Sequence, residues 1–146
     1  MSTIHIIVGS MLGGTEYVAE AAAAELEQNQ FKCKIHFQPD LSKIETQNTT
    51  WLICSSTHGA GDLPDNIQNF VSQVDQCEQD LSTVKFATIA TGDSSYDTYC
   101  KAAKDINNFL DSKSCKRILE TLFIDMQQEI DPEEEAENWI RSHIQS

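Results

Sequence analysis

The sequence predicts a doubly wound α/β protein, a three-layer sandwich on a five-stranded parallel sheet of order 2-1-3-4-5. Three observations support this prediction. Apolar strand-like runs and helical patterns alternate along the whole chain. The runs expected in the middle of the sheet are continuously apolar, as in strands that are covered on both faces. The second run alternates between apolar and polar residues, which places it at an edge of the sheet.

Five strands are expected in order along the chain. The first covers residues 4–8, and the second covers 31–37, where strict alternation indicates one buried and one solvent-exposed face. The third, at 51–54, and the fourth, at 86–90, are continuously apolar and are predicted to be central. The fifth strand is expected within 117–125, where the pattern is weaker than elsewhere.

Four helices are expected between and after these strands. The first covers about 15–29 and carries one apolar face. Apolar stripes at helical spacing within 67–74 and within 99–110 predict the second and third helices. The fourth begins near Asp131 and buries a stripe that ends at Ile144. Helices on both faces of a parallel sheet follow from right-handed crossover connections.

The expected starts of two helices carry recognisable signals. Asp62 is expected to cap the second helix, with Pro64 in its opening turn, where the missing N–H does little harm. Asp131 and Pro132 begin the last helix. Three glutamates at 133–135 then occupy its first turn, where negative charge suits the helix dipole.

Length and charge limit the classes of function. At 146 residues we expect a single domain over 1–146. The formal net charge of −13 disfavours nucleic-acid binding, because phosphate backbones are held by Lys and Arg. It suits a partner protein with a basic face, although solubility alone would also explain it. The sequence shows neither a signal peptide nor a membrane span, so we expect a cytoplasmic monomer without membrane contact.

The five cysteines stand at positions 33, 54, 77, 100 and 115 and are widely scattered. The sequence contains no Cys-x-x-Cys pair, which argues against zinc, an iron–sulfur cluster and a thioredoxin-type dithiol. We therefore expect no metal site, and free thiols in a reducing compartment.

Three loops rich in glycine and hydroxyl side chains, at 10–15, 55–62 and 91–96, each join an apolar run to a helical pattern. In an open parallel sheet such loops gather at the carboxyl ends of the strands, where ligands bind. The first loop offers the hydroxyls of Ser10 and Thr15 and the free N–H groups of a helix start, which together predict a phosphate site. It lacks the Gly-Lys-Ser/Thr ending of a Walker loop, so triphosphate hydrolysis is not expected. A tight turn without a ligand is the alternative.

Aromatic side chains in the other two loops predict a planar ligand. His58 stands beside a Gly-Ala-Gly turn and could cover one face of a flat ring, although a solvated histidine is the alternative. Tyr96 precedes the helical stripe, where an exposed ring is best explained by stacking on a ligand. Tyr99 continues the stripe and is expected to pack in the core.

Together these loops resemble those of the flavodoxin family, and the resemblance covers essentially the whole chain. Ser-Thr-His-Gly-Ala-Gly-Asp at 56–62 and Gly-Asp-Ser-Ser-Tyr at 92–96 match two specific motifs, most like those in the flavin domains of diflavin reductases. The chain's length, Gly-Gly-Thr-Glu-Tyr-Val-Ala-Glu at 13–20 and the motif at 56–62 are together most similar to small stand-alone bacterial members.

The resemblance implies FMN as the cofactor, with its phosphate on the loop at 10–15 and its ring between His58 and Tyr96. It assigns no catalytic residue and no metal. The residues that it assigns to cofactor binding are Ser10, Met11, Leu12, Gly13, Gly14, Thr15, Ser56, Thr57, His58, Gly59, Ala60, Gly61, Asp62, Thr91, Gly92, Asp93, Ser94, Ser95, Tyr96, Tyr99 and Cys100.

The function that the resemblance implies is one-electron transfer through FMN. The implied donor is a flavoprotein reductase with a basic face, and the implied acceptor is a metal- or radical-dependent enzyme, with biotin synthase as a candidate. The alternative is a binding or regulatory module on the same fold, with weak or no flavin and no redox role. Its support is Leu12, where the family usually has Thr, and Gly14, where the family often has a polar residue.

Other classes fit the residues less well. A phosphate-accepting receiver on the same fold needs an acidic cluster after the first strand, where this chain has Gly9 and Ser10. A hydrolase of the Gly-x-Ser-x-Gly type lacks its motif. A stand-alone NAD(P)H oxidoreductase would need a second domain to hold the nicotinamide, for which the chain is too short.

Overall fold

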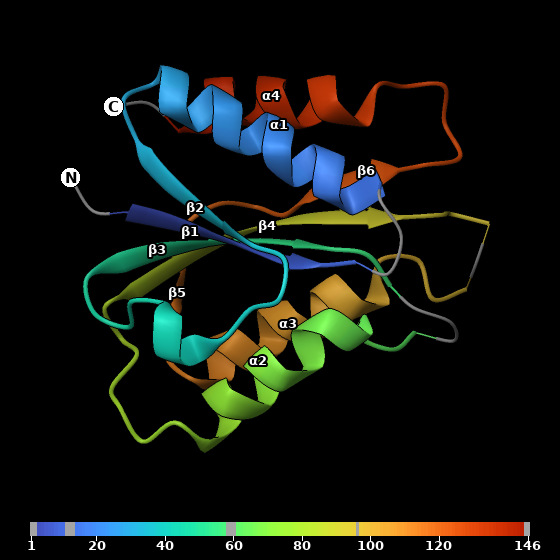
Figure 1. Cartoon of the computed structure of the whole chain (residues 1–146). Helices are drawn as coiled ribbons and strands as arrows, with labels where there is room; N and C mark the ends of the chain where they lie inside the picture. The colour runs from blue at the N-terminus through green and yellow to red at the C-terminus, as the bar shows by residue number, and fades with distance from the viewer. Residues whose placement is uncertain (1–2, 11–13, 58–60, 96, 145–146) are drawn as a thin grey trace.

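A computed structural model describes residues 3–10, 14–57, 61–95 and 97–144. Figure 1 shows three layers, with α1 and α4 on one face of the central sheet and α2 and α3 on the other. The elements in order are β1 (Thr3–Gly9), α1 (Gly14–Gln28), β2 (Lys32–His36), the short 3-10 helix η1 (Leu41–Lys43), β3 (Thr49–Ser55), α2 (Asp65–Gln76), β4 (Val84–Gly92), α3 (Lys101–Ser112), β5 (Lys116–Arg117), β6 (Leu122–Asp125) and α4 (Pro132–His143).

The sheet is parallel and has the order β2-β1-β3-β4-β5, which confirms the predicted topology. The expected fifth strand differs in being interrupted. β5 pairs with the start of β4, where Arg117 lies beside Phe86, and β6 pairs with its end, where Asp125 lies beside Gly92. Between the two pieces the chain includes the exposed Glu120, and of β6 only Ile124 is buried. This discontinuity explains why the apolar pattern is weak there.

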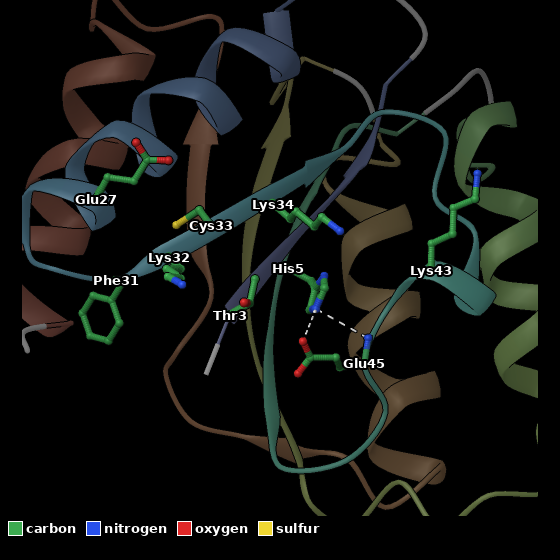
Figure 2. Close-up of a pocket in the computed structure, with 9 residues that line it drawn as sticks. All are labelled: Thr3, His5, Glu27, Phe31, Lys32, Cys33, Lys34, Lys43 and Glu45. Atoms are coloured by element: carbon green, nitrogen blue, oxygen red, sulfur yellow. Dashed lines mark hydrogen bonds and ion pairs between the residues drawn. The ribbon is translucent and has the colours of Figure 1, made fainter. Parts of the chain in front are cut away.

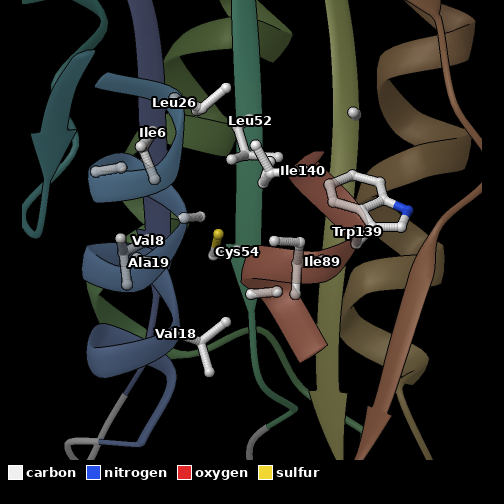
Figure 3. Close-up of a cluster of buried hydrophobic side chains, with 14 of the residues drawn as sticks. Ile6, Val8, Val18, Ala19, Leu26, Leu52, Cys54, Ile89, Trp139 and Ile140 are labelled. Atoms are coloured by element: carbon white, nitrogen blue, oxygen red, sulfur yellow. The ribbon is translucent and has the colours of Figure 1, made fainter. Parts of the chain in front are cut away.

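The sheet has a hydrophobic core on each face. Figure 3 shows the core under α1 and α4, where Ile6, Leu52 and Ile89 from three neighbouring strands meet Leu26 and Ile140 from the helices. The core on the α2 and α3 face contains a separate set of buried side chains, including Ile7, Trp51, Ile53, Phe70, Phe86 and Leu110. Burial of β1, β3 and β4 on both faces confirms that the continuously apolar runs are central strands.

The edge position of β2 is also confirmed. Cys33 and Ile35 are half-buried and pack against the core under α1, whereas Lys32 and Lys34 are exposed. β2 pairs on one side only, with β1. A strand with one covered face needs apolar residues at every second position only, which is the alternation that the sequence shows.

Two predicted helix starts need correction. Asp62 does not cap α2: it is exposed three residues before the helix, and Pro64 is the N-cap residue rather than a member of the first turn. α3 begins at Lys101, because Cys100 adopts a left-handed conformation (φ 55°) that ends the preceding turn. Tyr99 therefore lies outside the helix and is half-buried, and it packs against the buried Ala90, Cys100 and Ala103, so its expected place in the core is confirmed only in part.

The last helix begins as expected. The Asp131 side chain accepts hydrogen bonds from the backbone N–H groups of Glu133 and Glu134, and Pro132 opens the helix. Ala136, Trp139 and Ile140 are buried against the sheet. Ile144 lies one residue beyond the helix and packs on the same core.

The described parts of the chain also bear on membrane and metal binding. Within them, no helix is long and apolar enough to cross a bilayer. No group of three or more His, Cys, Asp or Glu side chains within the same residues could hold a metal ion. All five cysteines are free thiols, and each is buried or half-buried.

Candidate functional site

A cavity of about 430 Å³ lies at the carboxyl edge of the sheet, where β3 and β4 end and α1 begins. All three glycine- and hydroxyl-rich segments contribute to it. The lining residues are Gly14, Thr15, Ser56, Thr57, Thr91, Gly92, Asp93, Thr98, Tyr99, Cys100 and Met126. Among these, only Thr98 and Met126 are not predicted from the sequence.

Other predicted site residues lie near this cavity without lining it. Ser10 is buried at the end of β1, and its backbone N–H is bonded to Asn66 rather than directed to the cavity. Gly61 is buried with φ +107°, a left-handed conformation that favours glycine. The exposed residues that also do not line the cavity are Asp62, Ser94 and Ser95.

The remaining predicted site residues lie outside the described residues, so their roles stay predictions. They are Met11, Leu12, Gly13, His58, Gly59, Ala60 and Tyr96. Both proposed ring-covering side chains, His58 and Tyr96, belong to this group.

The start of α1 forms one end of the cavity. Gly14 and Thr15 begin the helix, whose first backbone N–H groups have no partner within the helix. Thr15 is almost fully buried, and its Oγ1 lies 2.8 Å from Oγ1 of Thr91 at the end of β4. No Lys, Arg or His belongs to the described lining. An anion bound here would therefore be held by N–H groups, hydroxyls and the helix dipole.

Close approach of two backbone segments forms the other end. A Cβ built on Gly92 would lie 2.9 Å from the Cys100 Sγ, 3.0 Å from Cδ1 of Tyr99 and 3.1 Å from the Cys100 backbone nitrogen. Only glycine therefore lets the turn that carries Tyr99 lie against the end of β4. The Thr57 hydroxyl oxygen accepts a 3.0 Å hydrogen bond from the Ala102 N–H and so joins the end of β3 to α3.

Tyr99 is the aromatic side chain of the described lining. Burial raises the pKa of its phenol to about 12, and the neighbouring Cys100 and Asp125 add to this rise in pKa. The phenol is therefore neutral at physiological pH. The ring lies 6.5 Å from that of Phe123, and the Lys104 ammonium is 6.0 Å from the Tyr99 centroid. Tyr99 is thus packed in place while it still borders the cavity.

Two carboxylates border this end of the site. Hydrogen bonds from Ser95 hold the pKa of Asp93 below its usual value, and hydrogen bonds from Ser94 and Gln127 do the same for the pKa of Asp125. The Gln127 amide also donates to Asp93 at 2.8 Å, which joins the segment after β4 to the segment after β6. Both groups are therefore ionised at neutral pH, and Asp93 places negative charge at the cavity.

The two lining residues that sequence reasoning misses are missed for different reasons. Thr98 lies only two residues beyond the predicted loop, and its hydroxyl could have been included on that ground. Met126 follows β6, whose bounds the weak apolar pattern does not define. A strand that ends at the same carboxyl edge as its neighbours is the signal that would have found Met126.

A second cavity, of about 460 Å³, lies at the amino ends of β1 and β2 and is drawn in Figure 2. His5 and Glu45 face each other there, with the His5 Nε2 3.7 Å from the Glu45 Oε1. The lining mixes Lys32, Lys34 and Lys43 with acidic residues. None of the three glycine-rich loops contributes a described residue to this cavity, so it is not the predicted ligand site.

Comparison with known proteins gives the family of the chain. The family model for flavodoxin matches residues 6–139. The MioC homolog of Haemophilus influenzae is 43% identical over 142 residues, which cover 97% of each chain. MioC proteins are the small stand-alone members that the motifs at 13–20 and 56–62 resemble, so that prediction is confirmed.

A larger protein and a solved structure extend the comparison. The NADPH sulfite reductase flavoprotein alpha-component of Bacillus subtilis is 30% identical over 139 residues, which cover 94% of this chain and 22% of that protein. The crystal structure of oxidised flavodoxin 1 from Bacillus cereus superposes with a TM-score of 0.84 at 25% identity, and the match covers 98% of this chain and 97% of that one. Flavodoxins bind FMN, so FMN is the cofactor that the comparisons imply. The chain belongs to the flavodoxin family.

Proposed function

We propose that this protein is an FMN-containing one-electron carrier that moves electrons from a flavoprotein reductase to an acceptor enzyme. The observation that carries the proposal is the cavity at the carboxyl edge. It combines the N-terminus of α1, a set of hydroxyls and the packed ring of Tyr99. When bound, FMN supplies the redox chemistry, and the protein supplies binding, orientation and charge.

The residues present fit this cofactor. A cavity of about 430 Å³ is within the usual range for small-molecule sites, roughly 300–1,000 Å³. The backbone N–H groups of Gly14 and Thr15 would hold the phosphate, and the Ser56 hydroxyl adds a neutral partner. Tyr99, beside the close approach at Gly92, would border the ring. The described site thus has a hydrogen-bonding end and an aromatic end formed by Tyr99, whereas the predicted ring-covering residues His58 and Tyr96 lie outside the described residues.

The charge of the protein supports a role in electron transfer. Asp93 is an ionised carboxylate at the cavity, so its field disfavours added negative charge inside the site and should lower the reduction potential there. The net charge of −13 would draw in a donor with a basic face and let it leave quickly. A metal- or radical-dependent acceptor, with biotin synthase as a candidate, and a cytoplasmic location stay predictions.

Flavin titration tests the proposal. The flavin-stripped protein is titrated into FMN, riboflavin and FAD, and quenching of flavin fluorescence is followed. We expect saturable quenching with a preference for FMN over riboflavin, because only FMN presents a terminal phosphate monoester to the helix start. Absence of quenching by the folded protein would refute FMN binding, and the flavin-free binding module would then replace the carrier.

A matched pair of threonine variants locates the phosphate. Thr15→Val removes the hydroxyl at the start of α1, whereas Thr50→Val makes the same change in β3, away from the cavity. We expect Thr15→Val to weaken FMN binding about tenfold with a smaller effect on riboflavin, and Thr50→Val to change neither. Equal effects of the two variants on FMN binding would place the phosphate elsewhere.

A further inference from the structure

The side chain of Asn66, in the first turn of α2, joins three separate segments at the carboxyl edge. Its Nδ2 donates to the Val8 carbonyl at 2.7 Å and to the Phe37 carbonyl at 2.9 Å. Its Oδ1 accepts a 2.9 Å hydrogen bond from the backbone N–H of Ser10. One amide therefore holds the end of β1, the segment after β2 and the first residue of the loop at 10–15.

The bond to Ser10 determines which N–H groups can meet a phosphate. The Ser10 N–H is already paired with Asn66, and Ser10 is only 7% exposed. Among the described residues, the backbone N–H groups that remain for a phosphate are therefore those at the start of α1, at Gly14 and Thr15. Three residues separate Ser10 from Gly14, so the chain between them can span only a short distance. Fixing Ser10 thus limits how far the start of α1 can lie from the end of β1.

We propose that Asn66 is a positioning residue for the phosphate loop, which it orients through the Ser10 N–H without lining the cavity itself. The inference rests on the proposed binding of FMN. Asn66 would determine how strongly the site distinguishes FMN from riboflavin, which has the same ring and lacks the phosphate. Such an anchor orders the N–H groups before the ligand arrives, which reduces the entropy that binding must overcome.

A purely structural role makes a different prediction. If Asn66 only stabilised the fold, its loss would lower the free energy of unfolding and weaken both flavins by the same factor. If it positions the loop, its loss weakens FMN selectively, because riboflavin makes no phosphate contact that depends on the loop. The ratio of the two dissociation constants therefore separates the two roles.

The experiment compares Asn66→Ala with Asn69→Ala, since Asn69 is an exposed residue of the same helix. The dissociation constants of flavin-stripped full-length protein for FMN and for riboflavin are measured by fluorescence quenching, and urea unfolding is measured alongside. We expect Asn66→Ala to weaken FMN binding about tenfold and riboflavin binding by about twofold at most. Asn69→Ala should leave both constants and their ratio unchanged.

A second variant keeps the test valid if Asn66→Ala does not fold. Asn66→Ser keeps a short polar group that cannot span Ser10 and both carbonyls at once, so the same selective loss of FMN binding is expected. A wild-type ratio of the two constants in the folded variant would overturn the role of Asn66. Failure of the wild-type protein itself to prefer FMN would instead overturn the proposed function, so the two failures are distinguishable.

Discussion

Acidification is expected to destabilise the fold through a pair of histidines on neighbouring strands. His5 in β1 is 2% exposed, and its Nδ1 lies 2.9 Å from Nε2 of His36 at the end of β2. The two rings stack with centroids 5.1 Å apart. A single hydrogen joins the two nitrogens, so the contact requires at least one neutral ring. Protonation of both rings would place two like charges against each other in a partly buried site.

The pKa values give the sign of the effect. Burial lowers the pKa of His36 to about 4, and the positive charges of His5 and Lys34 add to this lowering. Burial also lowers the pKa of His5, where Glu45 opposes this shift and Lys34 adds to it. In the unfolded chain both histidines protonate near about pH 6.5. The contribution of the two neutral histidines to the free energy of unfolding is therefore complete above about pH 6.5 and is lost as the pH falls toward 4.

The magnitude follows from the difference for His36. The pKa of His36 falls from its ordinary 6.5 to about 4, and at about 1.4 kcal/mol for each tenfold change this corresponds to at most about 3.5 kcal/mol. Solvent screening reduces this figure because His36 is only half-buried. We therefore expect His36 to contribute a loss of about 1–2 kcal/mol between about pH 7 and about pH 4.5.

Urea unfolding at these two pH values measures the loss. His36→Gln should reduce the difference between the two free energies of unfolding, whereas His143→Gln, at the exposed end of α4, should leave it as in the wild type. Four carboxylates also have lowered pKa values, namely those of Asp40, Asp80, Asp93 and Asp125. Their contributions to stability are lost mainly below about pH 4, outside the range between the two measurements. The same pH dependence in His36→Gln and in the wild type would show that His36 does not cause the loss of stability.

Three further predictions concern the cofactor edge. Gly92→Ala should destabilise the protein by about 1–3 kcal/mol in urea unfolding, because its Cβ would meet the backbone nitrogen of Cys100 at 3.1 Å. Gly14→Ala is the control, since among the described residues a Cβ there meets only Met126 Cε, at an ordinary 3.6 Å. Gly14→Ser should tighten FMN binding about threefold in the quenching titration by adding a hydroxyl at the helix start, and an unchanged constant would count against the phosphate end. Raising salt to about 0.5 M should change FMN affinity by less than about threefold, because no Lys or Arg belongs to the described lining. The same salt should slow reduction by a basic reductase about tenfold or more in stopped-flow measurements.

The parts of the fold that the sequence predicts well are those with strong local patterns. Continuous apolar runs correctly identify β3 and β4 as central, and alternation correctly places β2 at the edge. The interruption between β5 and β6 escapes prediction because each piece is short and depends on pairing with β4 rather than on its own residues. The start of α3 is predicted too early, since nothing local signals that Cys100 adopts a left-handed conformation.

The residues of the site likewise divide into those that local sequence patterns predict and those that they do not. Glycine and hydroxyl residues next to strand ends are visible in the sequence, and most of those that the structure describes line one cavity. The sequence does not show Asn66 as a positioning residue, because its role depends on the distant Ser10 N–H and on carbonyls at the end of β1 and just after β2. Helical spacing predicts Tyr99 in the core, whereas the turn before α3 leaves it half-buried at the cavity, where it also packs against the buried Ala90 and Cys100. Contacts between distant segments account for the missed role of Asn66, and the left-handed conformation of Cys100 accounts for the place of Tyr99.

Hydrogen bonds between loops make the carboxyl edge a single unit. Thr15 is bonded to Thr91, Thr57 caps α3 through the Ala102 N–H, and Asn66 holds Ser10. The Thr15–Thr91 pair is buried, so removing one hydroxyl leaves its partner without that hydrogen bond and costs stability even without ligand. The same contacts order the loops before a flavin arrives, which reduces the entropy lost on binding. Substitutions in these bonds should therefore lower stability and flavin affinity together, whereas Gly14→Ser, which breaks none of them, should change affinity alone.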